Sequence, residues 1–246
     1  MRRAGQITAA ARALAGKMVR PGVTTLEIDT AVRKFIEGQG AIPSFLHFPG
    51  PPGVRDFPGA ACISVNDEVI HGIPSNQVLK EGDIVSVDVG AYIGGFHGDC
   101  AATFPCGKVS DEAAKLIAVT EQSFWEGMKF ARFGYRVSDI SHAVQKYVEE
   151  NGFSVVRDYV GHGVGATCTK LRKFPTMANL ATVPGLLPDD PGGGTDGEPR
   201  RLAIKVMRDG WTVRTADGSL SAHYENSILI TKGEPEILTQ VGDLRL

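Results

Sequence analysis

The chain has 246 residues, of which 42% are apolar and 22% charged, and its formal net charge is −2. This composition is typical of a soluble globular enzyme with a substantial core, and the charge argues against a dominant nucleic-acid surface. Arg12 and Lys17 interrupt the Ala-rich N-terminal stretch, so no signal-peptide core is expected, and no segment has the length of a membrane span. The four cysteines show no CxxC spacing, which indicates reduced thiols and a cytoplasmic protein.

The hydrophobic pattern and the capping residues predict four helices. Thr24 and Glu27 form a capping box at the start of the second helix, and Ser110 precedes an acidic first turn of the third. The expected helices cover residues 4–18, 25–37, 111–130 and 139–150.

Runs of β-branched and aromatic residues predict strands between these helices. One strand, 155–160, should run directly into His162. The Pro- and Gly-rich stretch 43–58 is expected to be an ordered loop, either a pocket wall or a surface loop with aromatic anchors. Since helices and antiparallel hairpins interleave, the expected fold class is α+β. The expected strands are two within 61–74, then 84–89, 96–104, 155–160, 211–215 and 221–230.

The central stretch of the chain contains two strand-like runs joined by Gly94-Gly95, a pair suited to a two-residue hairpin turn. In that register Asp99 lies opposite Gly90, so Asp88 and Asp99 project from the same face as diagonal neighbours. Two carboxylates placed together repel each other and lose solvation, and a divalent cation compensates both costs. The alternative is a pair of acids on a solvated hairpin face.

Two further residues complete a candidate metal site. His162 is flanked by glycines that give its imidazole room to meet a ligand, and Glu225 lies inside a strand, where a carboxylate needs a partner. With Asp88 and Asp99 they form a set of carboxylates and one imidazole, which suits manganese, iron, cobalt or zinc. Carboxylates can bridge two ions about 3.5–4 Å apart, the spacing used to activate a water for hydrolysis.

Several motifs occur in the order that a known family has. They are V-N-D-E-V-I-H-G-I-P, V-D-V-G, G-D-C-A-A-T-F, G-H-G-V-G and S-L-S-A-H-Y-E-N-S-I. Together they resemble type I methionine aminopeptidase, which has the pita-bread fold, an antiparallel sheet core flanked by helices. The resemblance covers the chain from the first helix to about residue 165 and resumes at 204. We expect a single catalytic domain over 1–246, and a lone domain without an extra N-terminal domain favours this family over prolidase-like relatives.

The resemblance implies a role for each matching metal ligand. It assigns Asp88 to one of two divalent ions and His162 to the other, and it makes Asp99 and Glu225 bridging ligands of both ions. The implied reaction is hydrolysis of the first peptide bond of a chain that begins with Met, by attack of a metal-activated water.

The resemblance also implies which residues hold the substrate. His71 is similar to the family's substrate-contacting histidine, which helps to position the scissile amide, although a histidine between apolar neighbours is also consistent with a structural role. Cys62, Phe57 and Trp211 fall where the family lines its methionine side-chain pocket. A second histidine assists at the amide in the family, and an adjacent carboxylate handles the proton.

Residues 166–203 depart from the family pattern. The family has an H-E-x-P-x-V-P-N segment, which carries the second histidine, and a V-E-P strand whose glutamate binds metal. This chain reads A-T-C-T-K-L-R and P-D-D-P-G-G-G-T-D-G-E-P instead. By spacing, the missing ligand falls near Gly194 or Thr195. Glu198, in Gly-Glu-Pro, could mimic the family motif in an alignment, and whether it replaces the missing glutamate is left open. We interpret the segment as a shifted reading frame, because its codons permit family-like sequence in the neighbouring frames; a divergent insertion is the alternative.

The expected function is therefore metal-dependent removal of the N-terminal methionine from nascent proteins. Because a metal-binding glutamate is missing, we expect a weakened metal pair and low or no activity. The alternatives are a catalytically dead pita-bread binding protein and an Xaa-Pro-type aminopeptidase. The resemblance implies the ribosome exit region as a partner and a monomeric state, without membrane association or specific nucleic-acid binding.

Overall fold

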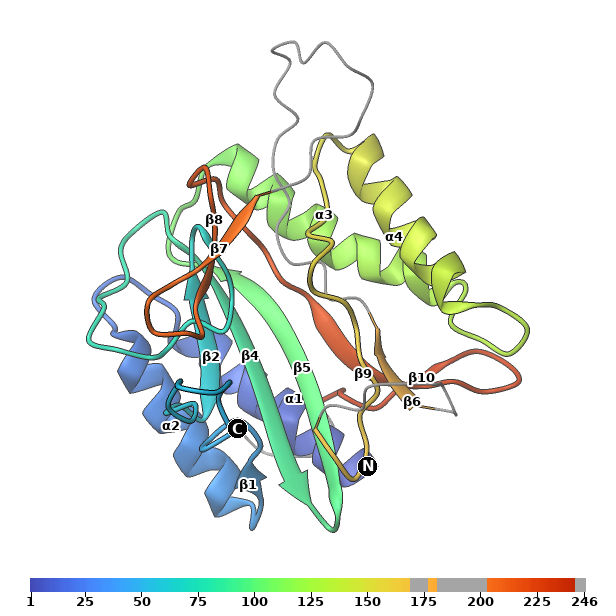
Figure 1. Cartoon of the computed structure of the whole chain (residues 1–246), viewed down its shortest axis with the longest axis horizontal. Helices are drawn as coiled ribbons and strands as arrows, with labels where there is room; N and C mark the ends of the chain where they lie inside the picture. Colours follow the sequence, from blue (N-terminus) through green and yellow to red (C-terminus); the bar gives the residue numbers. More distant parts are fainter. Residues whose placement is uncertain (169–176, 181–202, 242–246) are drawn as a thin grey trace.

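The structure is a computed structural model and describes residues 1–168, 177–180 and 203–241. In this part of the chain four helices flank two antiparallel sheets (Figure 1). The helices are α1 (Arg2–Met18), α2 (Thr25–Gly38), α3 (Asp111–Met128) and α4 (Val137–Glu150). The strands are β1 (Ile42–Pro43), β2 (Ala61–Val65), β3 (Glu68–Ile70), β4 (Ile84–Ile93), β5 (Phe96–Pro105), β6 (Met177–Leu180), β7 (Ile204–Val206), β8 (Val213–Thr215), β9 (Glu225–Leu229) and β10 (Glu236–Ile237).

The four expected helices are confirmed, with their ends within two residues of the predicted ones. At the start of α2 the Glu27 backbone N–H donates to Thr24 Oγ1, and the Glu27 side chain accepts from the Thr24 N–H at 2.7 Å. Ser110 accepts the Ala113 N–H at the start of α3. These caps satisfy backbone donors that a helix leaves without partners, which explains why the starting points were predictable from sequence.

The large sheet is built around the β4–β5 hairpin. Its strand order is β1-β4-β5-β9-β10, with β2 also paired to β4 and β6 also paired to β9, while β3-β8-β7 form the second sheet. In the hairpin Ile93 pairs with Phe96, and Gly94 and Gly95 have φ values of 60° and 83°, as a two-residue turn of this type requires. The predicted hairpin is confirmed.

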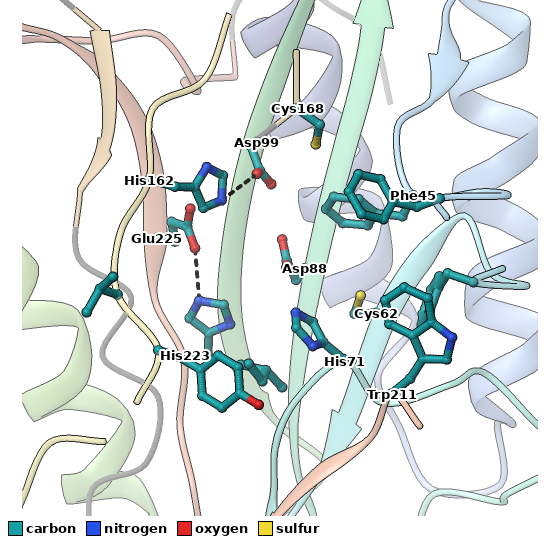
Figure 2. A pocket seen from close by; sticks show the side chains of 15 residues that line it. Phe45, Cys62, His71, Asp88, Asp99, His162, Cys168, Trp211, His223 and Glu225 are labelled. Atoms are coloured by element: carbon teal, nitrogen blue, oxygen red, sulfur yellow. Dashed lines mark hydrogen bonds and ion pairs between the residues drawn. The ribbon is translucent and has the colours of Figure 1, made fainter. Parts of the chain in front are cut away.

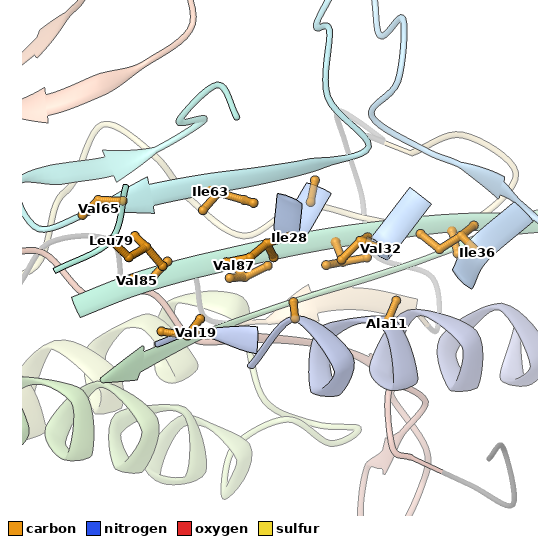
Figure 3. Packing of buried hydrophobic residues seen from close by; sticks show 14 of the residues in the cluster. Ala11, Val19, Ile28, Val32, Ile36, Ile63, Val65, Leu79, Val85 and Val87 are labelled. Carbon is orange, nitrogen blue, oxygen red and sulfur yellow. The ribbon is translucent and has the colours of Figure 1, made fainter. Parts of the chain in front are cut away.

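The two faces of β4 differ in character. Val85, Val87 and Val89 are fully buried against helices α1 and α2 (Figure 3). Burial of each side chain of this size stabilises a fold by about 1.5–3 kcal/mol. Ser86 and Asp88 alternate with these valines and therefore project from the opposite face. That face carries the candidate site. The other buried members of this core cluster include Ile7, Ala11, Ile28, Val32, Ile36, Ile63, Val65 and Leu79.

Helices α3 and α4 enclose a second apolar cluster at the end of the sheet. Leu116 of α3 and Val144 and Val148 of α4 pack with Ile84 at the start of β4 and with Phe153 after α4. The cluster holds the helix pair beside the sheet, at the Ile84 end of β4 (Figure 1). None of the helices in the described ranges is long and apolar enough to cross a membrane.

Two strand predictions need correction. The segment 155–160 forms no strand: Val156 is buried with Val69, Ile70 and Val213, but the segment pairs with no described strand. Tertiary context therefore overrides β propensity there. The strands at either side of Asp217-Gly218 are present as β8 and β9, but they belong to different sheets, so the turn links the two sheets.

One buried side chain fixes the edge of the cavity described below. Asp29 of α2 is 7% exposed, and its Oδ1 accepts the backbone N–H groups of Ala60 at 2.7 Å and Ala61 at 2.9 Å. These bonds hold the start of β2, one residue before Cys62.

We predict that Asp29→Ala destabilises the chain by about 2–4 kcal/mol, because two buried N–H groups lose their acceptor. Asp29→Asn keeps an oxygen at the same position and should retain most of the stability. Urea unfolding of the two variants and the wild type measures both effects. An Asp29→Ala midpoint equal to the wild-type midpoint would contradict this role.

Candidate metal centre and active site

A cavity of about 280 Å³ opens on the face of the large sheet that carries Asp88 (Figure 2). Every metal and substrate residue expected from the sequence contributes to its lining. Polar groups gather on one side and aromatic rings on the other. The lining residues are Phe45, Phe48, Phe57, Cys62, Ile70, His71, Asp88, Asp99, Tyr159, Val160, His162, Cys168, Trp211, His223 and Glu225.

The hairpin register brings the two predicted carboxylates together. Gly90 pairs with Asp99, and Asp88 pairs with Ala101, so Asp88 and Asp99 are diagonal neighbours on one face, as predicted. Oδ1 of Asp88 is buried and has no hydrogen-bond partner within the described residues. Burial, followed by the charges of Asp99 and Glu225, raises the pKa of Asp88 well above its ordinary value. A buried carboxyl group in this state is suited to a cation.

Asp99, His162 and Glu225 form the tightest group of potential ligands. Each offers a ligand atom that lies within 4.8 Å of those of the other two. His162 Nε2 is 3.6 Å from Asp99 Oδ2, while its Nδ1 is 3.2 Å from the carbonyl oxygen of Gly163. A proton on Nδ1 donated to that carbonyl leaves the Nε2 lone pair directed into the cavity. Burial lowers the pKa of His162, but Glu225 and Asp99 outweigh it and raise the pKa overall.

Strands β5 and β9 are held together by side chains as well as by their ladder. The ladder is short, with Cys100 paired to Asn226 and Ala101 paired to Glu225. Ser227 Oγ accepts the Asp99 N–H at 3.1 Å and donates to the Asp99 carbonyl at 2.8 Å. These bonds continue the strand pairing to Asp99 and set its distance from Glu225.

Arg12 secures the same junction from the opposite face. This residue of α1 is half-buried, and its Nη1 donates to the carbonyl oxygens of Ala101 at 3.0 Å and Glu225 at 3.1 Å and to Asn226 Oδ1 at 3.2 Å. Since Ala101 and Glu225 are register partners, one guanidinium group bonds both strands at the level of a candidate ligand.

His71 lies on the opposite side of Asp88 from Asp99 and His162 (Figure 2). It follows β3 directly and has a φ of 57°, a strained conformation for a residue other than glycine and one that is enriched at functional sites. Its ring lies edge to face with those of Tyr159 and Trp211, with ring centroids 6.0 Å and 6.3 Å apart. Burial, with a smaller effect of His223, lowers the pKa of His71 to about 4, so the ring is neutral at pH 7.

The apolar wall of the cavity contains the three residues expected to form a side-chain pocket. Phe57 is buried and contacts Trp211 edge to face, with ring centroids 5.3 Å apart. The indole N–H of Trp211 donates to the Arg55 carbonyl at 2.8 Å, so the loop before Phe57 helps to hold the indole. Burial raises the pKa of the Cys62 thiol, which keeps it neutral beside the carboxylates.

Sequence reasoning missed part of the lining. His223 is 3% exposed, and its Nε2 lies 3.1 Å from Glu225 Oε2. The spacing of two between His223 and Glu225 was a usable signal, because alternate residues of an extended chain share a face. Cys168 and Tyr159 also reach the cavity, whereas Phe45 belongs to the loop 43–58, for which a pocket wall was one of the two expectations. The segment that should carry the second histidine and the missing glutamate, with Gly194, Thr195 and Glu198, lies outside the described residues apart from its ends and 177–180.

Comparison with known proteins agrees with this geometry. The sequence pattern of metallopeptidase family M24 matches residues 1–232. A methionine aminopeptidase of Clostridium perfringens is 47% identical over 98% of this chain and 95% of its own length. Methionine aminopeptidase 1 of Bacillus subtilis is 45% identical with the same coverage of both chains.

Solved structures show the same fold. The crystal structure of methionine aminopeptidase from Rickettsia prowazekii superposes with a TM-score of 0.85 at 33% identity, over 97% of this chain and 95% of that one. A prolidase from Pyrococcus horikoshii superposes with a TM-score of 0.70 at 15% identity, over 98% of this chain and 61% of that one, which is a likeness of fold alone. The α+β class and the pita-bread architecture expected from the sequence are confirmed. The chain belongs to metallopeptidase family M24 and, within it, to the type I methionine aminopeptidases.

Proposed function

We propose that the chain hydrolyses the first peptide bond of polypeptides that begin with methionine, using divalent metal ions. The observation that supports this most directly is the convergence of Asp88, Asp99, His162 and Glu225 on one side of a cavity whose other side is apolar. The related proteins named methionine aminopeptidase support the same activity. They do not favour the Xaa-Pro aminopeptidase or the inactive binding protein as alternatives.

The donor set of the cavity fits a divalent metal. Three buried or half-buried carboxylates and one imidazole lie together, and one Asp88 oxygen has no hydrogen bond within the described part of the chain. We propose that two ions bind there, with Asp88 on one, His162 on the other, and Asp99 and Glu225 shared. This donor set suits manganese, iron, cobalt or zinc. When bound, such ions supply Lewis-acid polarisation of the scissile carbonyl and an activated water.

The remaining lining residues would hold the substrate. Phe57, Cys62 and Trp211 offer the methionine side chain an apolar surface, and sulfur–aromatic contacts are favourable. His71 is neutral at pH 7, so its contribution at the scissile amide is a hydrogen bond rather than a charge. A carboxylate of the cluster accepts the proton released by the attacking water.

The wider setting follows from the same proposal. We infer a single catalytic domain over 1–246 that acts as a monomer in the cytoplasm on nascent polypeptides, near the ribosome exit region. Because the glutamate expected near residue 194 is replaced, the metal pair should be weakened and turnover low.

The first prediction concerns metal dependence. Release of Met from a Met-Ala-Ser peptide should require added Mn²⁺ or Co²⁺, stop on chelation, and stay below that of the Bacillus subtilis relative. Asp99→Asn should lower the rate of Met release by at least about 100-fold. The reason is that residues that only hydrogen-bond to a metal ligand already contribute about 10–100-fold to metal affinity or activity. Asp111→Asn, an exposed residue of α3, is the matched control.

Other outcomes of this assay would be informative. Release of Xaa from Xaa-Pro peptides without release of Met would contradict the proposed substrate. Metal binding without any turnover would favour the binding role. Turnover equal to that of the Bacillus subtilis relative would contradict the weakened metal pair.

A second prediction concerns acid stability. The native pKa of His71, about 4, lies below the value of about 6.5 for an unfolded chain, so the native state binds fewer protons between these values. Stability of the metal-free chain should therefore fall as the pH drops from 6.5 to 4, by at most about 3 kcal/mol for this residue. His71→Gln removes this loss, whereas His142→Gln, at an exposed position of α4, should behave as the wild type. Equal pH dependence of all three chains in urea unfolding would refute a lowered pKa of His71.

A third prediction concerns the gene. If residues 166–203 arise from a shifted reading frame, resequencing should reveal a base insertion or deletion near each end of the segment. An unbroken frame in several independent reads would establish a divergent insertion instead.

A further inference from the structure

His223 occupies a position that the proposed mechanism does not yet use. The residue is 3% exposed and lines the cavity, on the side opposite His71 (Figure 2). Its Nε2 lies 3.1 Å from Glu225 Oε2. Since a carboxylate oxygen only accepts, the Nε2 proton donates to Glu225, and the ring contacts the carboxylate of a candidate metal ligand from outside the ligand cluster.

The backbone of His223 is fixed by a single hydroxyl group. Thr103 Oγ1 accepts the His223 N–H at 2.7 Å and donates to the His223 carbonyl at 3.0 Å. Ser86 Oγ lies 2.8 Å from the same Thr103 oxygen, and Ser86 and Thr103 are register partners in the β4–β5 hairpin. With the Thr103 proton on the carbonyl, Ser86 is the donor in this bond.

These contacts form one chain of hydrogen bonds from the hairpin to a candidate ligand. Ser86 lies two residues before Asp88 on the same face of β4, and Thr103 lies on the corresponding face of β5. The hairpin thus presents two carboxylates directly and fixes a third, Glu225, through Thr103 and His223. All the links are buried, where hydrogen bonds of a connected network hold side chains in a single orientation.

We propose that His223 is a positioning residue: its Nε2–H group holds the Glu225 carboxylate in the orientation that faces Asp99 and His162, and thereby sets the metal affinity of the site. The inference rests on the proposed function, because it concerns the same site. Partners that orient a metal-bound group contribute 10–100-fold to metal affinity in proteins.

The test measures Mn²⁺ affinity by calorimetry and the visible absorption spectrum of the Co²⁺-loaded chain, neither of which needs turnover. His223→Leu should weaken Mn²⁺ binding by about 10–100-fold and change the Co²⁺ spectrum. His223→Gln should bind within about threefold of the wild type, because the glutamine amide nitrogen is as many bonds from Cα as Nε2 and can donate to Glu225. His142→Leu, a histidine replacement on the exposed face of α4, should leave both readouts unchanged.

A second pair of variants tests the support of His223 and leaves the imidazole in place. Thr103→Val removes the hydroxyl group that holds the His223 backbone and should weaken Mn²⁺ binding, whereas Thr103→Ser should restore it. Circular dichroism establishes that each variant is folded. Equal Mn²⁺ affinity of His223→Leu and the wild type would overturn the inference, and so would equal losses in the Leu and Gln variants. A wild-type chain that binds no Mn²⁺ would overturn the proposed function as well, so the two failures are distinguishable.

Discussion

The site depends on the register of one hairpin. Side chains alternate along a strand, so a slip of one residue between β4 and β5 would turn Asp99 toward the face that helices α1 and α2 cover. Ten residue pairs and a two-glycine turn with positive φ at both positions prevent this slip. This pairing sets the positions of Asp88 and Asp99 in the cavity. Through Thr103 it also sets the position of His223.

The two faces of the same hairpin have different roles: one face stabilises the fold, and the other carries the candidate site. The valines of β4 bury apolar surface against α1 and α2, which favours folding. The other face of the sheet carries Asp88 and Asp99 of the hairpin and Glu225 of β9, and these carboxylates oppose folding through repulsion and lost solvation. The protein tolerates this arrangement because the apolar cluster behind the sheet is large. Without a cation the acidic cavity lowers the stability of the folded chain. A site of this kind reaches its lowest free energy only when its ligand is bound.

Much of the fold was predictable from local chemistry. The four helices follow from capping residues and periodicity, and the hairpin follows from Gly94-Gly95 between β-branched runs. The sequence also indicated the four candidate ligands that line the cavity, because each is a charged or imidazole group set among apolar or glycine neighbours. The side-chain pocket residues came from the family resemblance alone.

The incorrect strand predictions have a common physical cause. Pairing between segments that are distant in the chain cannot be read from the local sequence pattern. Residues 155–160 have strand-like composition but pair with no described strand, and β8 and β9 belong to two different sheets although a turn joins them. His223 was overlooked although its spacing from Glu225 is local; only the Thr103 hydroxyl group that fixes its backbone, 120 positions away, could not be read from the local pattern. The roles of the segment around residue 194 stay predictions.

Arg12 has a consequence for the order in which the molecule can form. Its guanidinium group joins the first helix to the carbonyl of Glu225, a residue 213 positions later in the chain. Helix α1 and the β4–β5 hairpin are synthesised before β9, which follows the hairpin by more than 100 residues. The candidate site is therefore completed only after β9 has been made. Until then the group of candidate ligands lacks Glu225.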